Sequence, residues 1–76
     1  MVSADEAAEL LSLALDLPLD ALKEARRGVT PEWDSLHHVE LMFLVEERTG
    51  VLLEPEQLAE IIDLPSLIRV MSSLST

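Results

Sequence analysis

The stretch EWDSLHHVELMFLVEERTG, residues 32–50, decides the fold because it predicts a helix with a start signal and a stop signal. Asp34 is a residue type that caps helix N-termini, and Gly50 is the type that most often ends a helix in the left-handed conformation. We therefore expect a helix over residues 35–49. At about 100° per residue, its apolar side chains fall on two faces, one suited to a core and one to a partner.

The core face of this helix is predicted from helical spacing. It carries Leu41, Leu44 and Val45, with Met42 at its margin. These aliphatic side chains recur three and four residues apart, which is typical of the buried side of an amphipathic helix. We expect His38 to pack at the edge of this core.

The second face combines apolar and acidic side chains next to Ser35. Its members are Leu36, Val39 and Phe43, bordered by Glu40, Glu46 and Glu47. Such a surface suits docking on a basic protein patch that contains an apolar pocket. The alternative is that the preceding connection or the next helix covers the apolar side chains, and that the glutamates form only a solvated face.

The first helix is predicted over residues 3–16. Ser3 and Glu6 have the spacing of a capping box, and apolar residues recur behind them at helical spacing. Prolines and glycine then interrupt the pattern and predict a long connection, with a short helical option near residues 20–25. We expect four side chains to pack this connection onto the core: Leu17, Leu22, Val29 and Trp33.

Two more helices are predicted after Gly50. Pro55 and Pro65 stand where proline is favoured, in the first turn of a helix. The helix at Pro55 is short, and the helix at Pro65 presents apolar residues at helical spacing: Leu67, Ile68, Met71 and Leu74. The predicted fold class is all-α, a small four-helix bundle with a long loop between helices one and two and a short third helix.

Length and composition limit the classes of function. A chain of 76 residues predicts a single domain over residues 1–76 that hides only about 60% of its unfolded surface, which argues against an enzyme with a deep active site. Hydrophobic residues are 49% of the chain and aromatic residues only 3%, so an aliphatic helical core is expected. The formal net charge of −10 disfavours nucleic acid and anionic membranes and favours basic protein partners.

Targeting and metal signals are weak in this sequence. There is no cysteine for a disulfide or a thiolate metal site. The opening lacks the basic region of a secretory signal, and no apolar run approaches the roughly 20 residues that span a bilayer. We expect a cytoplasmic protein that is a monomer and holds no metal.

Ser35 has three chemical interpretations. A hydroxyl at a helix N-terminus lies where unpaired N–H groups and the helix dipole favour a phosphate ester, which suits covalent modification. The simplest alternative is a residue that only starts the helix. Asp34, Ser35 and His38 also invite comparison with a hydrolytic triad, but Asp34 is poorly placed to orient His38, and no oxyanion hole is evident.

The segment DSLHHVELMFLVEERTG resembles the acyl carrier protein family, in which Asp-Ser-Leu starts the second helix, Val-Glu-Leu follows, and an acidic end precedes glycine. The likeness extends upstream through ELLSLALDLPLDAL and downstream through PEQLAEIIDLPSL, and so covers nearly the whole chain. The resemblance implies a 4′-phosphopantetheine arm on Ser35, with Asp34 as its motif neighbour. The thiol of this arm holds acyl or aminoacyl groups as thioesters.

The resemblance also implies partners and their docking surface. The partners are a phosphopantetheinyl transferase, a loading ligase or transferase that supplies the acyl or aminoacyl group, and downstream biosynthetic enzymes. The family's recognition surface matches Leu36, Val39, Glu40, Phe43, Glu46 and Glu47.

The sequence departs from the pattern of fatty-acid carriers at two places. PEWDSL replaces the usual leucine-glycine lead-in, and His37 stands where fatty-acid carriers generally have an acidic residue. Both favour a freestanding carrier in secondary metabolism, of the polyketide or nonribosomal peptide type. The competing function is an unmodified acidic helical adaptor, which would not need the hydroxyl of Ser35.

Overall fold

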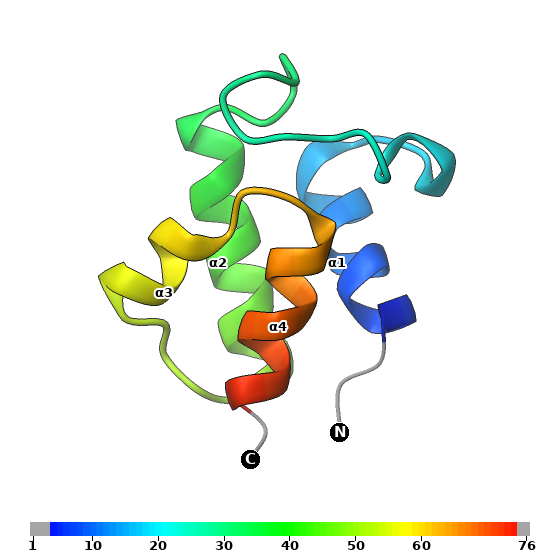
Figure 1. The fold of residues 1–76 in the computed structure, drawn as a ribbon. Coiled ribbons are helices and arrows are strands. Elements are labelled where there is room, and N and C mark those ends of the chain that lie inside the picture. Colours follow the sequence, from blue (N-terminus) through cyan, green and yellow to red (C-terminus); the bar gives the residue numbers. More distant parts are fainter. Residues whose placement is uncertain (1–3, 75–76) are drawn as a thin grey trace.

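The computed structural model describes residues 4–74 and shows a small helical bundle (Figure 1). Its α-helices are α1 (Ala4–Leu15), α2 (Ser35–Thr49), α3 (Pro55–Glu60) and α4 (Leu64–Leu74). A short 3-10 helix, η1 (Leu19–Ala21), lies in the connection between α1 and α2. The described residues contain no strand, so the predicted all-α class, the long first loop and the short third helix are confirmed. The capping box expected at Ser3 lies outside the described residues.

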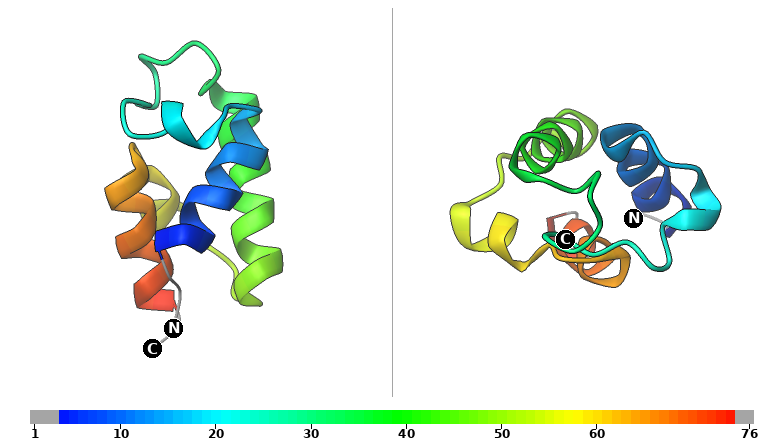
Figure 2. Two further views of the ribbon diagram at one scale, coloured as in Figure 1. Left: turned by 90° about the vertical axis from the view of Figure 1, so that its right-hand side faces the viewer. Right: turned by 90° about the horizontal axis from the view of Figure 1, so that it is seen from above.

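The core lies between α1, α2 and α4, while α3 packs at the side (Figure 2). Helix α2 contributes Leu41 and Val45, both fully buried, and Leu44 packs against them from a half-buried position. The predicted core face of this helix is therefore confirmed. Burying a leucine or valine side chain contributes roughly 1.5–3 kcal/mol, which makes this face the main reason that α2 adopts its orientation.

The long connection runs over the upper ends of the helices and is anchored by large apolar side chains (Figures 1 and 2). Leu22 and Trp33 are buried as predicted, and Leu17 packs against the core. The prediction for Val29 was wrong, because this side chain is 79% exposed. Hydrogen bonds from Val29 N and Thr30 N to Arg26 O close a turn that carries Val29 outward.

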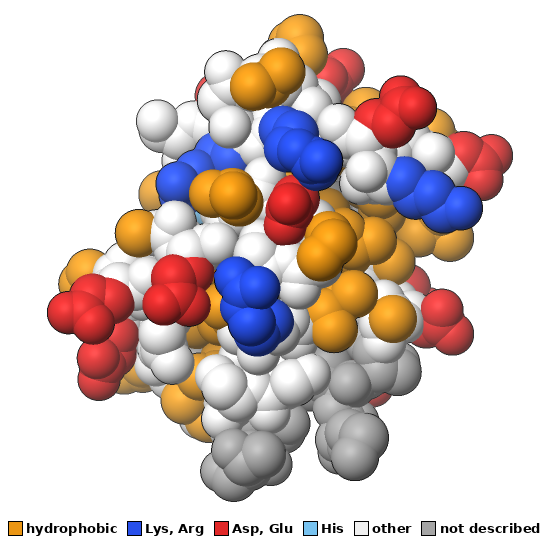
Figure 3. Space-filling view, viewed as in Figure 1, with side chains coloured by type: hydrophobic (Ala, Val, Ile, Leu, Met, Phe, Trp, Pro, Cys, Tyr) orange, Lys and Arg blue, Asp and Glu red, His pale blue; other side chains and the backbone are white. Residues whose placement is uncertain are grey.

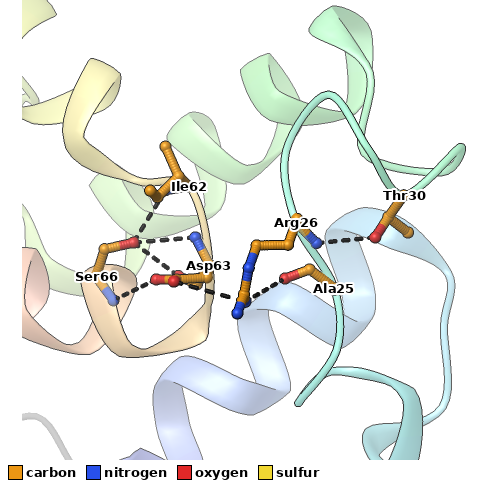
Figure 4. A network of polar contacts seen from close by, with 6 residues as sticks. All are labelled: Ala25, Arg26, Thr30, Ile62, Asp63 and Ser66. Carbon is orange, nitrogen blue, oxygen red and sulfur yellow. Dashed lines mark hydrogen bonds and ion pairs between the residues drawn. The ribbon is translucent and has the colours of Figure 1, made fainter.

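A polar network fastens the long connection to the turn between α3 and α4 (Figure 4). The Arg26 guanidinium lies 3.6 Å from the Asp63 carboxylate, and the Arg26 backbone N–H donates to Thr30 Oγ1 at 2.8 Å. Asp63 also accepts a hydrogen bond of 2.9 Å from Ser66 N at the start of α4. These contacts lower the pKa of Asp63, with the Ser66 hydrogen bonds as the main cause. The long connection is thereby tied to the turn before α4.

None of the helices in residues 4–74 combines the length and the hydropathy needed to cross a bilayer.

Candidate functional site

The N-terminus of α2 is built by the predicted cap. Asp34 has an extended backbone, and its Oδ1 accepts a hydrogen bond of 2.9 Å from the backbone N–H of His37. Ser35 is the first residue of the helix and is exposed. Within residues 4–74 its hydroxyl makes no hydrogen bond. The hydroxyl is therefore available to a reaction partner without breaking a contact that supports the fold.

Asp34 and His37 form an ion pair beside this serine. Nδ1 of His37 lies 2.7 Å from Oδ1 of Asp34. This side-chain hydrogen bond raises the pKa of His37, whereas the two hydrogen bonds from His37, with the backbone one first, lower the pKa of Asp34. The pair therefore favours the protonated form of His37 and the ionised form of Asp34 at the N-terminus of α2.

The predicted burial of His38 at the core edge is confirmed, and its hydrogen bonds fix its chemical state. The indole Nε1–H of Trp33 can only donate, so Nδ1 of His38 accepts this bond of 2.9 Å. The ring proton of neutral His38 is then on Nε2, which donates to Leu58 O at 3.0 Å. Both ring nitrogens are thus engaged away from Ser35, and the geometry is not that of a Ser–His catalytic pair.

Arg27 lies next to His38 and joins the long connection to α3. Its Nη1 donates to Leu58 O at 3.4 Å and its Nη2 donates to Ala59 O at 3.1 Å. The guanidinium is also 3.1 Å from Nε2 of His38. Burial, as the main cause, and this neighbouring charge lower the pKa of His38. His38 is therefore a neutral structural residue.

An open hollow of about 540 Å³ lies beside Ser35. It is formed where the long connection meets the start of α2, and its lining residues are Arg27, Gly28, Trp33, Asp34, Ser35, His38 and Val39. Trp33 and His38 are buried, so they lie at its base. The members from Trp33 onward were singled out from the sequence, Gly28 was noted only as a break in the helical pattern, and Arg27 was missed. No local pattern marks Arg27, because its partners are carbonyls about thirty residues further along the chain.

The apolar residues predicted for the second face of α2 are exposed. Leu36 is 67% exposed, Val39 is 40% exposed and Phe43 is 59% exposed. Neither the long connection nor α3 covers them, so the alternative that predicted their burial was wrong. Together with Ser35, they form a continuous strip along α2 that is free to contact another molecule.

The three glutamates at the border of this strip differ in their contacts. Glu40 and Glu47 are exposed, and neither makes an ion pair within the described part of the chain. Glu46 is half-buried, and its Oε2 accepts a hydrogen bond of 2.7 Å from Leu53 N in the loop before α3. Glu46 therefore has a structural role that the sequence did not show, and Glu40 and Glu47 are the freer acidic groups.

The two adjacent histidines, His37 and His38, are the candidates for metal ligands in the segment after Ser35. His37 is bonded to Asp34 at the surface, whereas His38 is buried against Trp33. No group of three or more potential ligands among histidine, aspartate and glutamate residues gathers anywhere in residues 4–74. The His-His pair therefore does not form a chelate in this arrangement.

Comparisons with protein-family models, with curated proteins and with solved structures found no match to this chain.

Proposed function

We propose that this protein is a freestanding carrier protein that bears a 4′-phosphopantetheine arm on Ser35 and presents the attached group to biosynthetic enzymes. One observation carries the proposal. The exposed and unbonded hydroxyl of Ser35 stands at the head of an exposed strip of apolar residues on α2 that is bordered by acidic side chains. The resemblance of this segment to acyl carrier proteins supports the same assignment.

The surroundings of Ser35 fit a phosphodiester-linked arm. Ser35 is exposed and lines an open hollow, so there is space beside it for a long substituent. The first backbone N–H groups of α2 and its dipole favour a negative charge at this position. When bound, the arm supplies a thiol that holds an acyl or aminoacyl group as a thioester. The chain itself orients the attachment point and docks on partners, and it needs no catalytic residue.

The charge distribution supports docking through α2. The chain has five basic residues, of which Lys23, Arg26 and Arg27 lie in the long connection and Arg69 lies in α4. Figure 3 shows the face of the molecule that carries α4, and basic side chains lie there among acidic and hydrophobic ones. Only Arg48 lies on α2, near its C-terminal end. The strip beside Ser35 is therefore apolar and acidic, and it suits partners with a basic rim around an apolar pocket.

Weak docking suits a carrier because the group must be handed from one enzyme to the next. A covalent tether raises the effective concentration of the group at each enzyme, so tight docking is unnecessary. The proposed partners are a phosphopantetheinyl transferase, a loading ligase or transferase, and downstream enzymes of a specialised pathway. Trp33 and His37, where the family pattern has other residues, favour that pathway over primary fatty-acid synthesis. A cytoplasmic location is part of the same proposal.

The test is the mass of the intact protein after incubation with a promiscuous phosphopantetheinyl transferase, Mg²⁺ and coenzyme A. We expect a gain of one phosphopantetheine in the wild type and in Ser73→Ala, an exposed serine of α4 that serves as the control. We expect no gain in Ser35→Ala, which should keep its helical circular dichroism spectrum. An unmodified wild type beside an active control carrier would reject the proposal and favour the unmodified acidic adaptor.

A further inference from the structure

Arg27 is a cation that lines the hollow beside Ser35 and has no carboxylate partner within residues 4–74. Its neighbour Arg26 differs, because Arg26 pairs with Asp63 at 3.6 Å. Of the five basic residues only Arg26 forms an ion pair with a carboxylate within the described residues, and Arg27 differs from the other unpaired cations because it lines the hollow. Its charge remains available to an anion from outside the fold.

The guanidinium of Arg27 is held in place by backbone carbonyls. Its Nη1 and Nη2 donate to the carbonyls of Leu58 and Ala59, and its backbone N–H donates to Ile62 O at 2.9 Å. The Nε–H makes no hydrogen bond within residues 4–74. A donor group that is already oriented loses less conformational entropy when it binds a ligand. Arg27 is therefore prepared for an anion that approaches through the hollow.

The other walls of the hollow strengthen such an interaction. Val39 contributes exposed apolar surface above the buried Trp33, and a Cβ atom added at Gly28 would meet no atom within 4 Å, so the space beside Gly28 is open. Low polarity around a half-buried guanidinium reduces the screening of its charge by water. The volume of about 540 Å³ falls within the roughly 300–1,000 Å³ that small-molecule sites occupy.

Asp34 also lines the hollow, and its charge must be considered. Its Oδ1 is occupied by the backbone N–H and the ring of His37, at 2.9 Å and 2.7 Å. When His37 is protonated, its ring offsets the charge of Asp34, and the unpaired charge at the hollow is then that of Arg27. One unpaired positive charge is neutralised by a ligand with a single negative charge, whereas a dianion would leave an excess negative charge in the hollow.

We propose that Arg27 and the hollow form a subsite for a monoanion carried on Ser35. This inference rests on the proposed function and specifies what the site beside Ser35 recognises. Two parts of the loaded protein have this chemistry: the phosphodiester that joins the arm to Ser35, and a carboxylate at the end of the attached acyl group. Arg27 pairs with this anion and holds the arm against Val39.

The experiment compares wild-type protein, Arg27→Gln and the control Arg26→Gln in three forms: with the bare arm, with a butyryl group and with a succinyl group on the arm. The readouts are the midpoint of thermal unfolding and the NMR signal of Arg27 Nε–H. If the phosphodiester is the anion, attaching the bare arm raises the midpoint and shifts the signal in the wild type. If the cargo carboxylate is the anion, only the succinyl form does so. In both cases Arg27→Gln loses the rise and Arg26→Gln keeps it.

The subsite is rejected if Arg27 Nε–H keeps its position in every form of the wild type, or if Arg27→Gln and Arg26→Gln respond alike. Should Arg27→Gln fail to fold, the wild-type signal alone decides. If mass spectrometry shows no modification of Ser35, the proposed function fails separately. Titration of the unmodified protein with two monoanions, dimethyl phosphate and butyrate, then tests the subsite: a saturable shift of Arg27 Nε–H supports it, and no shift rejects it.

Discussion

The indole N–H of Trp33 donates a hydrogen bond of 2.9 Å to Nδ1 of His38, and this contact joins the end of the long connection to the first turns of α2. Trp33 is fully buried and His38 is 7% exposed. Within the described chain no buried side-chain nitrogen or oxygen lacks a hydrogen-bond partner. The pair therefore supports the segment that presents Ser35, and it sets the floor of the hollow beside it.

Replacing Trp33 with Phe should lower the free energy of unfolding by about 2–4 kcal/mol. The shorter ring leaves a cavity, and Nδ1 of His38 loses its donor in a buried position. Urea unfolding followed by circular dichroism measures this change. The control is Phe43→Leu, since Phe43 is 59% exposed and its replacement should change stability by less than about 0.5 kcal/mol. Equal losses in the two variants would contradict the structural role of Trp33.

The two histidines should give opposite pH dependences of stability. The pKa of His38 is lowered from 6.5, so the fold favours its neutral form, and this contribution is full above 6.5 and is lost as the pH falls toward the lowered value. The pKa of His37 is raised, so its contribution is full below 6.5 and is lost as the pH rises through the raised value.

The measurement is urea unfolding of the wild type, His38→Gln and His37→Gln between about pH 5.5 and pH 8, a range that spans the ordinary histidine pKa. Relative to the wild type, His38→Gln should lose less stability on acidification. His37→Gln should lose less stability as the pH rises above neutrality. Parallel curves for all three proteins would show that neither histidine is linked to folding.

The sequence predicted most of what depends on local signals. Asp34 caps α2, and Gly50 ends it with a φ of 72°. The core and exposed faces of α2 also followed from helical spacing, because an exposed amphipathic helix repeats every 3.6 residues whatever surrounds it. Features that depend on distant segments were missed: Arg27 binds carbonyls of α3, and Glu46 binds the backbone of Leu53.

The error at Val29 has a similar cause. Apolar character predicted burial, but a turn that begins at Arg26 directs this side chain to solvent. The direction of a turn depends on backbone hydrogen bonds in the folded loop, such as those from Val29 N and Thr30 N to Arg26 O. Hydrophobicity alone does not contain this information.

A matched pair of leucine variants distinguishes the buried face of α2, which stabilises the fold, from the exposed face, which is proposed to dock on partners. Leu41 is fully buried and Leu36 is 67% exposed. Leu41→Ala should lower the free energy of unfolding by about 2–5 kcal/mol, because it leaves a cavity in the core. Leu36→Ala should change it by less than about 0.5 kcal/mol. If Leu36→Ala destabilises the fold as much as Leu41→Ala does, the strip beside Ser35 is a packing surface and not a docking surface.

Charge reversal at the border of the strip should weaken docking without weakening the fold. Glu40 and Glu47 are exposed and make no ion pair in the described part of the chain, so Glu40→Lys and Glu47→Lys break no ion pair, although Glu40→Lys also removes a favourable charge near His37. Each should slow modification of Ser35 by the transferase at low salt, by about threefold to tenfold, and the difference from the wild type should shrink at high salt. The control Glu9→Lys makes the same change in net charge on α1. If Glu9→Lys slows the reaction equally, net charge and not the strip on α2 governs the encounter.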